Sequence, residues 1–178
     1  MPPSAVCSAM RALEKAKIPA EGLAAALAGD TPGVPRRWRL VFTASASDVR
    51  SDAGGGRYFP ITAVQSWDAA AGRIVNGVYI GHLAALQFSG PCRLTGKRLE
   101  FDFTQLSLKL LGGVARFSLK PAGYALPEKG TREAGALPFF LFAQADEQTV
   151  VARGRSGGVA LWARATPSWE LTAGATPL

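Results

Sequence analysis

Side chains that could act as nucleophiles, bases or metal ligands are sparse in this chain. Its 178 residues hold one histidine, His82, and two cysteines, Cys7 and Cys92. A serine or cysteine nucleophile would need His82 as its base, and His82 stands beside Gly81 at an expected turn, where an exposed histidine is the simpler interpretation. No pair among these three residues has the spacing of a zinc site. The two cysteines could pair, but they do not indicate a disulfide framework.

Two pairs of charged residues could also carry chemistry. Glu100 and Asp102 fall on one face of a predicted strand together with Arg98, which favours solvated charges over an acid/base pair. Asp146 and Arg153 flank a predicted hairpin, where they could form a structural ion pair or contact a lipid headgroup. We therefore predict a protein without catalytic residues, metal or cofactor, and we do not expect an enzyme.

The glycine-rich segment 154–158 could be mistaken for a phosphate-binding loop. It lacks the strand–GxxxxGK[ST]–helix context of such loops, and its glycines suit a hairpin turn instead. The chain is basic, with 20 Lys and Arg against 13 Asp and Glu and a net charge of +7. These charges are scattered rather than gathered in a block, so we predict no nucleic-acid partner. Anionic lipid surfaces are favoured, with headgroup or surface contacts expected from Arg36, Arg37, Arg153 and Arg155.

Hydrophobic periodicity divides the chain into three parts. Residues 1–30 carry helical spacing over 4–17 and 20–28, which predicts an N-terminal helical segment. Residues 36–165 switch to a period of two, and residues 166–178 form a glycine- and proline-rich tail that we expect to be loosely held. The expected strands cover residues 37–44, 58–67, 73–80, 83–89, 98–104, 106–111 and 114–120, followed by three strands within 139–164.

Residues 106–111 could instead form a helical turn, so the count is roughly eight or nine short strands at near-regular spacing, which is typical of an up-and-down barrel or a sandwich. A barrel of about eight strands is just wide enough to hold one small apolar ligand, or to be filled by its own side chains. If it is hollow, Gln65 and Asn76 would orient a ligand's polar end. The lipid-binding lining predicted for the interior is Trp38, Phe42, Gln65, Trp67, Asn76, Phe101, Phe103, Phe140, Phe142 and Trp162.

The order of several weak motifs adds a resemblance to this pattern. A short helix leads into Trp38-Arg39-Leu40-Val41-Phe42-Thr43, and a later strand ends in Gln65-Ser66-Trp67-Asp68 before Gly72-Arg73-Ile74-Val75-Asn76. The alternating residues 99–103 follow, and Asp146, Arg153-Gly154 and a last strand at 159–162 close the series. Over residues 20–164 this order resembles the plastid lipid-associated proteins, also called plastid fibrillins.

Two positions depart from that family's closing motif. Gln144 stands where an aromatic residue is usual, and Val150 where the family has a second arginine. If that arginine helps to hold the barrel mouth or binds a headgroup in the family, its role is lost here or taken by Arg155.

The resemblance implies a mainly β fold, a lipocalin-like antiparallel β-barrel whose short N-terminal helices cap it. It further implies a chloroplast location, at thylakoids, at plastoglobules or in the stroma. The implied function is non-catalytic binding of a prenyl-lipid, a carotenoid or an acyl lipid at such a surface. The alternative is a filled barrel that serves as an interaction subunit or assembly factor of a larger plastid membrane protein complex.

Overall fold

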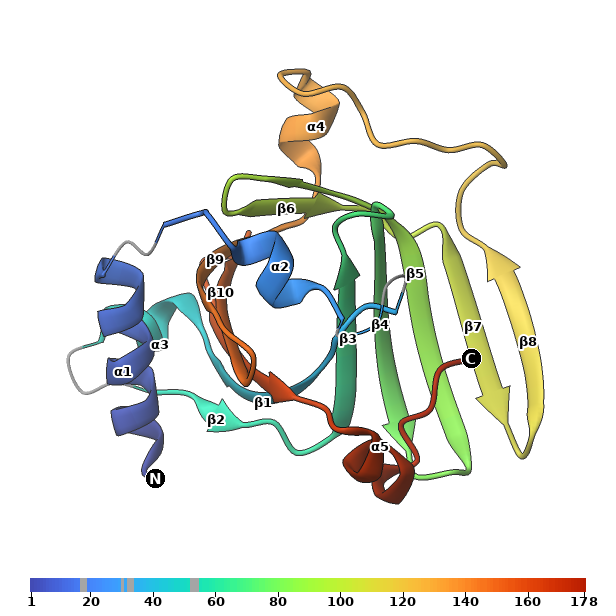
Figure 1. The fold of residues 1–178 in the computed structure, drawn as a ribbon, viewed down its shortest axis with the longest axis horizontal. Helices are drawn as coiled ribbons and strands as arrows, with labels where there is room; N and C mark the ends of the chain where they lie inside the picture. The colour runs from blue at the N-terminus through green and yellow to red at the C-terminus, as the bar shows by residue number, and fades with distance from the viewer. Residues whose placement is uncertain (17–18, 30, 32–33, 52–54) are drawn as a thin grey trace.

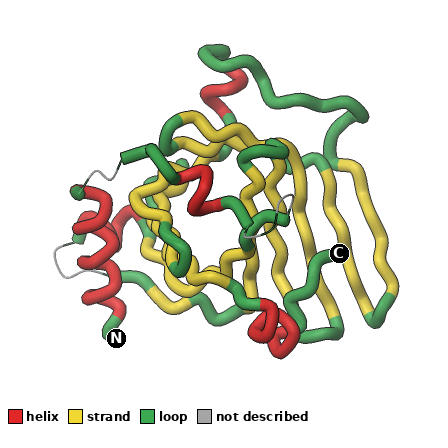
Figure 2. The backbone as a smooth tube through the Cα atoms, viewed as in Figure 1, coloured by secondary structure: helices red, strands yellow, loops and turns green. Residues whose placement is uncertain are grey.

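The computed structural model describes residues 1–16, 19–29, 31, 34–51 and 55–178. Its strands form one antiparallel sheet, in which eight strands close into a barrel in the order β4-β3-β1-β11-β10-β9-β6-β5, with β5 paired back to β4 (Figures 1 and 2). The mainly β, lipocalin-like barrel expected from the sequence is therefore confirmed. The barrel strands are β1 (Arg37–Ala44), β3 (Thr62–Asp68), β4 (Arg73–Ile80), β5 (Ala84–Thr95), β6 (Arg98–Phe101), β9 (Phe139–Ala145), β10 (Thr149–Gly154) and β11 (Val159–Arg164).

The sheet forks along β5. One edge of this long strand pairs with β4, whereas the other edge pairs first with β7 (Gln105–Leu110) and then with β6. Residues 102–104 separate β6 from β7, so the strand expected over 98–104 is shorter than predicted. They pass so close to Gly90 that a Cβ there would lie 2.1 Å from the carbonyl oxygen of Asp102. Glycine at this position is what lets residues 102–104 lie so close to β5.

After the fork the two strands diverge. β6 pairs with β9 and completes the barrel, whereas β7 pairs with β8 (Gly113–Ser118). We call β7 and β8, residues 105–118, the wing, because they extend the sheet beyond the barrel, at the right of Figure 1. A further short strand, β2 (Arg57–Tyr58), pairs with β1; β2 and β3 divide the single strand expected over 58–67, with Pro60 between them.

The two N-terminal helices cover two different parts of the barrel. α2 (Leu23–Leu27) buries Leu23 and Leu27 against the interior cluster that contains Trp38 and Trp67, so it caps one end. α1 (Pro3–Lys15) instead packs on the outside, with Val6, Cys7 and Met10 in a second cluster. The predicted helical cap is thus one short helix rather than the whole N-terminal segment. The expected end of the first helix at residue 17 lies outside the described residues.

The C-terminal tail is not loosely held, contrary to expectation. α5 (Pro167–Ala173) begins with the Thr166 hydroxyl accepting a hydrogen bond from the Trp169 backbone N–H (3.3 Å), and it ends at Gly174 in the left-handed conformation. Ala175 is fully buried in an outer cluster with Val64, Tyr79 and Ala85. The tail therefore covers the outer face of β3, β4 and β5.

Two more short helices lie between the predicted strands. α3 (Ala46–Arg50) follows β1, and Ser45 with Asp48 forms a capping box at its start. α4 (Arg132–Ala136) lies in the long connection between β8 and β9. Among the described residues, no helix is both long and apolar enough to cross a membrane.

Candidate functional site

The middle of the barrel is filled by aromatic side chains. Trp67 is the hub, with ring centroids 5.4 Å from Trp162, 5.5 Å from Phe142 and 6.4 Å from Trp38. All four rings are at most 2% exposed. Four of the residues predicted to line a cavity are therefore brought together, but they pack against one another as core.

This core keeps unused hydrogen-bonding capacity. In the described part of the chain, the indole Nε1 atoms of Trp38, Trp67 and Trp162 and the Oε1 atom of Gln65 are buried without a hydrogen-bond partner. Asn76 pairs with Gln65 across β3 and β4 and is half-buried. The interior thus offers three donors and an acceptor amid apolar surface, an arrangement that costs stability unless something binds them.

Phe42 does not line the interior, contrary to prediction. The pairing of β1 with β11 shifts register between Leu40 and Phe42, and such a bulge reverses the face on which later side chains lie. Phe42 consequently packs outside the barrel with Cys7 and Met10 of α1. The extra residue leaves no mark in the alternating sequence, so sequence reasoning could not have found it.

The open end of the barrel, opposite α2, carries the apolar cavities. One pocket of about 600 Å³ has Phe140, Ala152 and Ala160 on its floor, and a second of about 490 Å³ adjoins it against Phe101. The two pockets share Phe140, and we call them together the barrel mouth. Volumes of this order are typical of small-molecule sites. Phe103, also predicted to line the interior, stands beside Phe101 with ring centroids 5.4 Å apart.

Polar groups surround the barrel mouth. Ser45, Asp48, Arg57 and Ser156 line the larger pocket. Hydrogen bonds from the Ser45 side chain and backbone, helped by the charge of Arg57, lower the pKa of Asp48, so this rim carboxylate stays ionised. None of these rim residues was predicted from the sequence. The one available signal was the capping-box spacing of Ser45 and Asp48, which predicts a helix start rather than a site.

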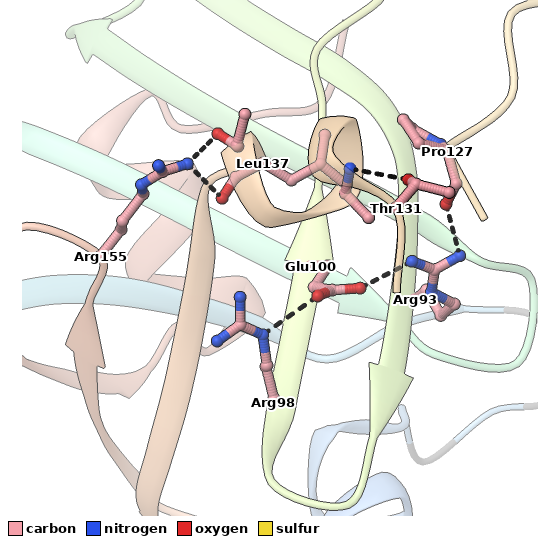
Figure 3. A network of polar contacts seen from close by, with 9 residues as sticks. Arg93, Arg98, Glu100, Pro127, Thr131, Leu137 and Arg155 are labelled. Atoms are coloured by element: carbon pink, nitrogen blue, oxygen red, sulfur yellow. Dashed lines mark hydrogen bonds and ion pairs between the residues drawn. The ribbon is translucent and has the colours of Figure 1, made fainter. Parts of the chain in front are cut away.

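A polar network anchors the other wall of the mouth (Figure 3). Arg155 donates to the backbone carbonyls of Ala136 and Leu137 at the end of α4. Nearby, Glu100 accepts from Arg93 (2.7 Å) and from Arg98 (3.1 Å), and Arg93 also donates to the Pro127 carbonyl (3.0 Å). These contacts tie the connection between β8 and β9 to the barrel and so position Pro138 and Phe139 at the pocket.

The remaining arginines predicted to meet headgroups also have partners within the chain. Arg37 pairs with Glu170 and donates to the Ala175 carbonyl (2.6 Å), and Arg36 donates to the Ala26 carbonyl (2.9 Å). All of these contacts hold helices or the tail to the barrel. Their geometry gives the arginines structural roles.

The ion pair predicted between Asp146 and Arg153 is wrong. Arg153 instead pairs with Glu14 of α1 through two hydrogen bonds of 2.8 and 2.7 Å. Asp146 accepts from the backbone N–H groups of Gln148 and Thr149 in its own turn. The two residues lie at opposite ends of β10, too far apart along the strand to meet.

The groups considered for catalysis are separated. His82 is exposed in the turn between β4 and β5, and it is not among the residues that line the mouth. Both cysteines are free thiols in different buried clusters, and burial raises the pKa of Cys92 to about 12. No group of three or more metal-ligating side chains occurs within the described residues. The arrangement at the mouth can hold an apolar group beneath a polar one.

A second, more polar pocket lies beside β5 and β7. It has a volume of about 460 Å³ and includes Arg73, Lys120 and Tyr124. Tyr124 donates to Asp102 (2.6 Å), which raises the pKa of the tyrosine to about 12, and Lys120 pairs with the same carboxylate (3.2 Å). Because Lys120 and Tyr124 are already paired with Asp102 and the pocket offers no apolar floor like that of the barrel mouth, the mouth is the stronger candidate for an apolar ligand.

Comparison with known proteins leaves the site to be judged on its geometry. No family model matches the chain, no curated protein matches it, and no solved structure matches it.

Proposed function

We propose that the protein binds an apolar lipid or pigment at the barrel mouth without transforming it. The single observation that carries this proposal is the pair of adjoining pockets over Phe140, which place an apolar floor directly on the aromatic core. The ring centroid of Phe140 lies 5.5 Å from that of Trp162 and 5.2 Å from that of Phe101. A bound hydrocarbon would therefore extend the buried cluster. Asp48, Arg57 and Ser156 would face its polar end.

The nature of the ligand follows from the resemblance to plastid fibrillins. This resemblance supports a prenyl-lipid, a carotenoid or an acyl lipid as the ligand, bound at a thylakoid or plastoglobule surface. The filled centre of the barrel supports a further point: the ligand occupies the mouth rather than threading through the barrel.

The filled centre also favours a second function, that of an interaction subunit or assembly factor in a plastid membrane protein complex. In that case the barrel would be a scaffold and the mouth would hold no ligand. The two functions are separated by what the native protein carries. Mass spectrometry of its organic extract is expected to find lipid or pigment under the first proposal, and co-purification of a protein complex without extractable lipid would favour the second.

Direct binding can be tested in solution without vesicles, using the fluorescent polyene cis-parinaric acid as the probe. Ala160 lies on the floor of the mouth, whereas Ala163 pairs with Thr149 and Arg39 on the outer face of the same strand. We expect Ala160→Phe to weaken probe binding about tenfold or more, because the new ring fills the pocket. The matched variant Ala163→Phe should bind like the wild type. Equal binding by both variants, or none by the wild type, would contradict the proposal.

A further inference from the structure

One face of the wing is apolar and uncovered. Leu106, Leu108 and Leu110 of β7 stand opposite Phe117, Ala115 and Gly113 of β8, and paired residues of an antiparallel sheet share a face. Within this face Leu108, Leu110 and Phe117 are between 41% and 59% exposed. Every residue of β8 is exposed.

Four highly exposed apolar side chains gather at the end of the wing. The turn between β7 and β8 and the turn between β4 and β5 lie together, because the Leu111 backbone N–H donates to the Leu83 carbonyl (2.9 Å). Ile80, Leu83, Leu110 and Leu111, which we call the tip, are 59% to 79% exposed. A cluster of large apolar side chains on protruding turns is unusual for a surface that meets water alone.

The turn itself is built at a conformational cost. Leu111 has a φ of 47° and Gly112 a φ of 89°, the left-handed pair of a tight hairpin. Asparagine, aspartate and glycine are favoured at the first of these positions because an ordinary side chain is strained there. Leucine at this point places a hydrocarbon side chain at the outermost part of the wing despite the strain.

The charge around the tip has one sign. The sequence has no Asp or Glu between Asp68 and Glu100, and none between Asp102 and Glu128. Lys109 and Arg116 lie on the wing, on the face opposite Leu108. Glu170 of the neighbouring α5 is paired with Arg37. An uncovered apolar tip with cations behind it and no carboxylate of its own complements an anionic, apolar surface.

We propose that the tip docks on an anionic lipid bilayer, with the wing end-on to the surface, so that the leucines enter the interface and Lys109 and Arg116 on the other face of the wing lie toward the headgroups. A second copy of the chain is disfavoured as the occupant, because it would bring like charges together. This inference rests on the lipid-surface part of the proposed function and names the surface that makes the contact. It does not depend on ligand binding at the barrel mouth.

Cosedimentation of the full chain with vesicles tests the proposal. We expect binding to vesicles of phosphatidylcholine and phosphatidylglycerol, weaker binding to phosphatidylcholine alone, and a decrease at raised salt. Leu83→Asn/Leu111→Asn should weaken binding about tenfold or more, because the leucines supply the buried apolar area. Lys109→Gln/Arg116→Gln should weaken it about fivefold per charge, and on the anionic vesicles alone.

The tip variant should also remain folded, because asparagine accepts the left-handed conformation at residue 111 better than leucine does. Thermal unfolding checks this point. Leu141→Asn is the matched control, since Leu141 is an exposed leucine on β9, outside the wing.

Three outcomes would overturn the docking proposal. They are unchanged vesicle binding by the folded tip variant, an equal loss in the Leu141 control, and a wild-type dimer that the tip substitutions dissociate. Binding of cis-parinaric acid without vesicles keeps the two proposals apart. The tip variant should retain it, and Ala160→Phe should retain vesicle binding.

Discussion

Strands β6 and β7 lie along the same edge of β5, separated by residues 102–104, yet their surroundings differ completely. β6 continues into a closed barrel, and its inward residue Leu99 is fully buried beside Trp67. β7 continues into the wing, where alternate residues have the same apolar character and remain exposed. A similar alternation of apolar and polar residues therefore leads to a buried face in β6 and to an exposed face in β7. The two strands differ in whether other parts of the chain cover their apolar face.

Substitutions in the barrel and in the wing should differ most in their effect on the free energy of unfolding at Trp67, the hub of the barrel. We expect Trp67→Ala to lower the free energy of unfolding by about 3–5 kcal/mol, because it removes the ring that contacts Trp38, Phe142 and Trp162. Phe117→Ala on the wing should cost less than about 1 kcal/mol, since half of that side chain is already exposed. Chemical denaturation of both variants measures the difference. Similar losses would mean that the wing is covered in solution.

The barrel could be predicted from the sequence, whereas the bulge in β1 and the place where the sheet forks could not. Alternation in β1 places Trp38 on the inner face, and its place in the buried interior cluster confirms this. The bulge that turns Phe42 outward and the fork after Phe101 depend on which strands meet in space, and local alternation does not record that.

The candidate site divides in the same way. Phe101 and Phe140 were expected at an apolar site and do line the mouth, because strand alternation is a local property. The rim of Ser45, Asp48 and Arg57 comes from the start of α3 and from the two-residue strand β2, both of which lie over the barrel end. Their approach is set by tertiary contacts, so no spacing in the sequence indicates it. The packing of the C-terminal tail against the barrel was not predicted for a similar reason. Ala175 is small, and no hydrophobic periodicity surrounds it in the sequence.

A second, smaller effect is expected at the fork. Gly90→Ala should lower the free energy of unfolding by about 1–3 kcal/mol, because the new methyl group would meet the backbone of residues 102–104 and neither segment can move without breaking strand pairing. Gly113→Ala is the matched change on the wing, where the atom nearest to the added methyl group would be 3.5 Å away. It should be close to neutral by the same measurement. A neutral Gly90→Ala would show that the contact between Gly90 and residues 102–104 is looser than the backbone distances indicate.

The smallest effect that we predict is a difference between the barrel and the wing in how their stability depends on pH. Hydrogen bonds from Arg93, assisted by Arg98, outweigh burial and lower the pKa of Glu100 below its ordinary value of 4.5. The unfolded chain therefore binds this proton more readily than the folded one, so the network's contribution is present above about pH 4.5 and is lost as pH falls toward the folded pKa. Glu100→Gln should make the free energy of unfolding fall less steeply over that range.

The wing provides the contrast for this measurement, because residues 105–118 contain no carboxylate. Asp102, just before β7, also has a lowered pKa: burial would raise it, but hydrogen bonds from Tyr124, Lys120 and the Phe103 backbone outweigh that effect. Acid should therefore weaken the barrel side of the fork and the attachment of residues 120–124 before it acts on the wing itself. Protection against hydrogen exchange, compared between neutral pH and about pH 3, measures this order. An earlier loss of protection in β7 and β8 on acidification, with β5 and β6 still protected, would contradict this order and would make the wing the more acid-sensitive region.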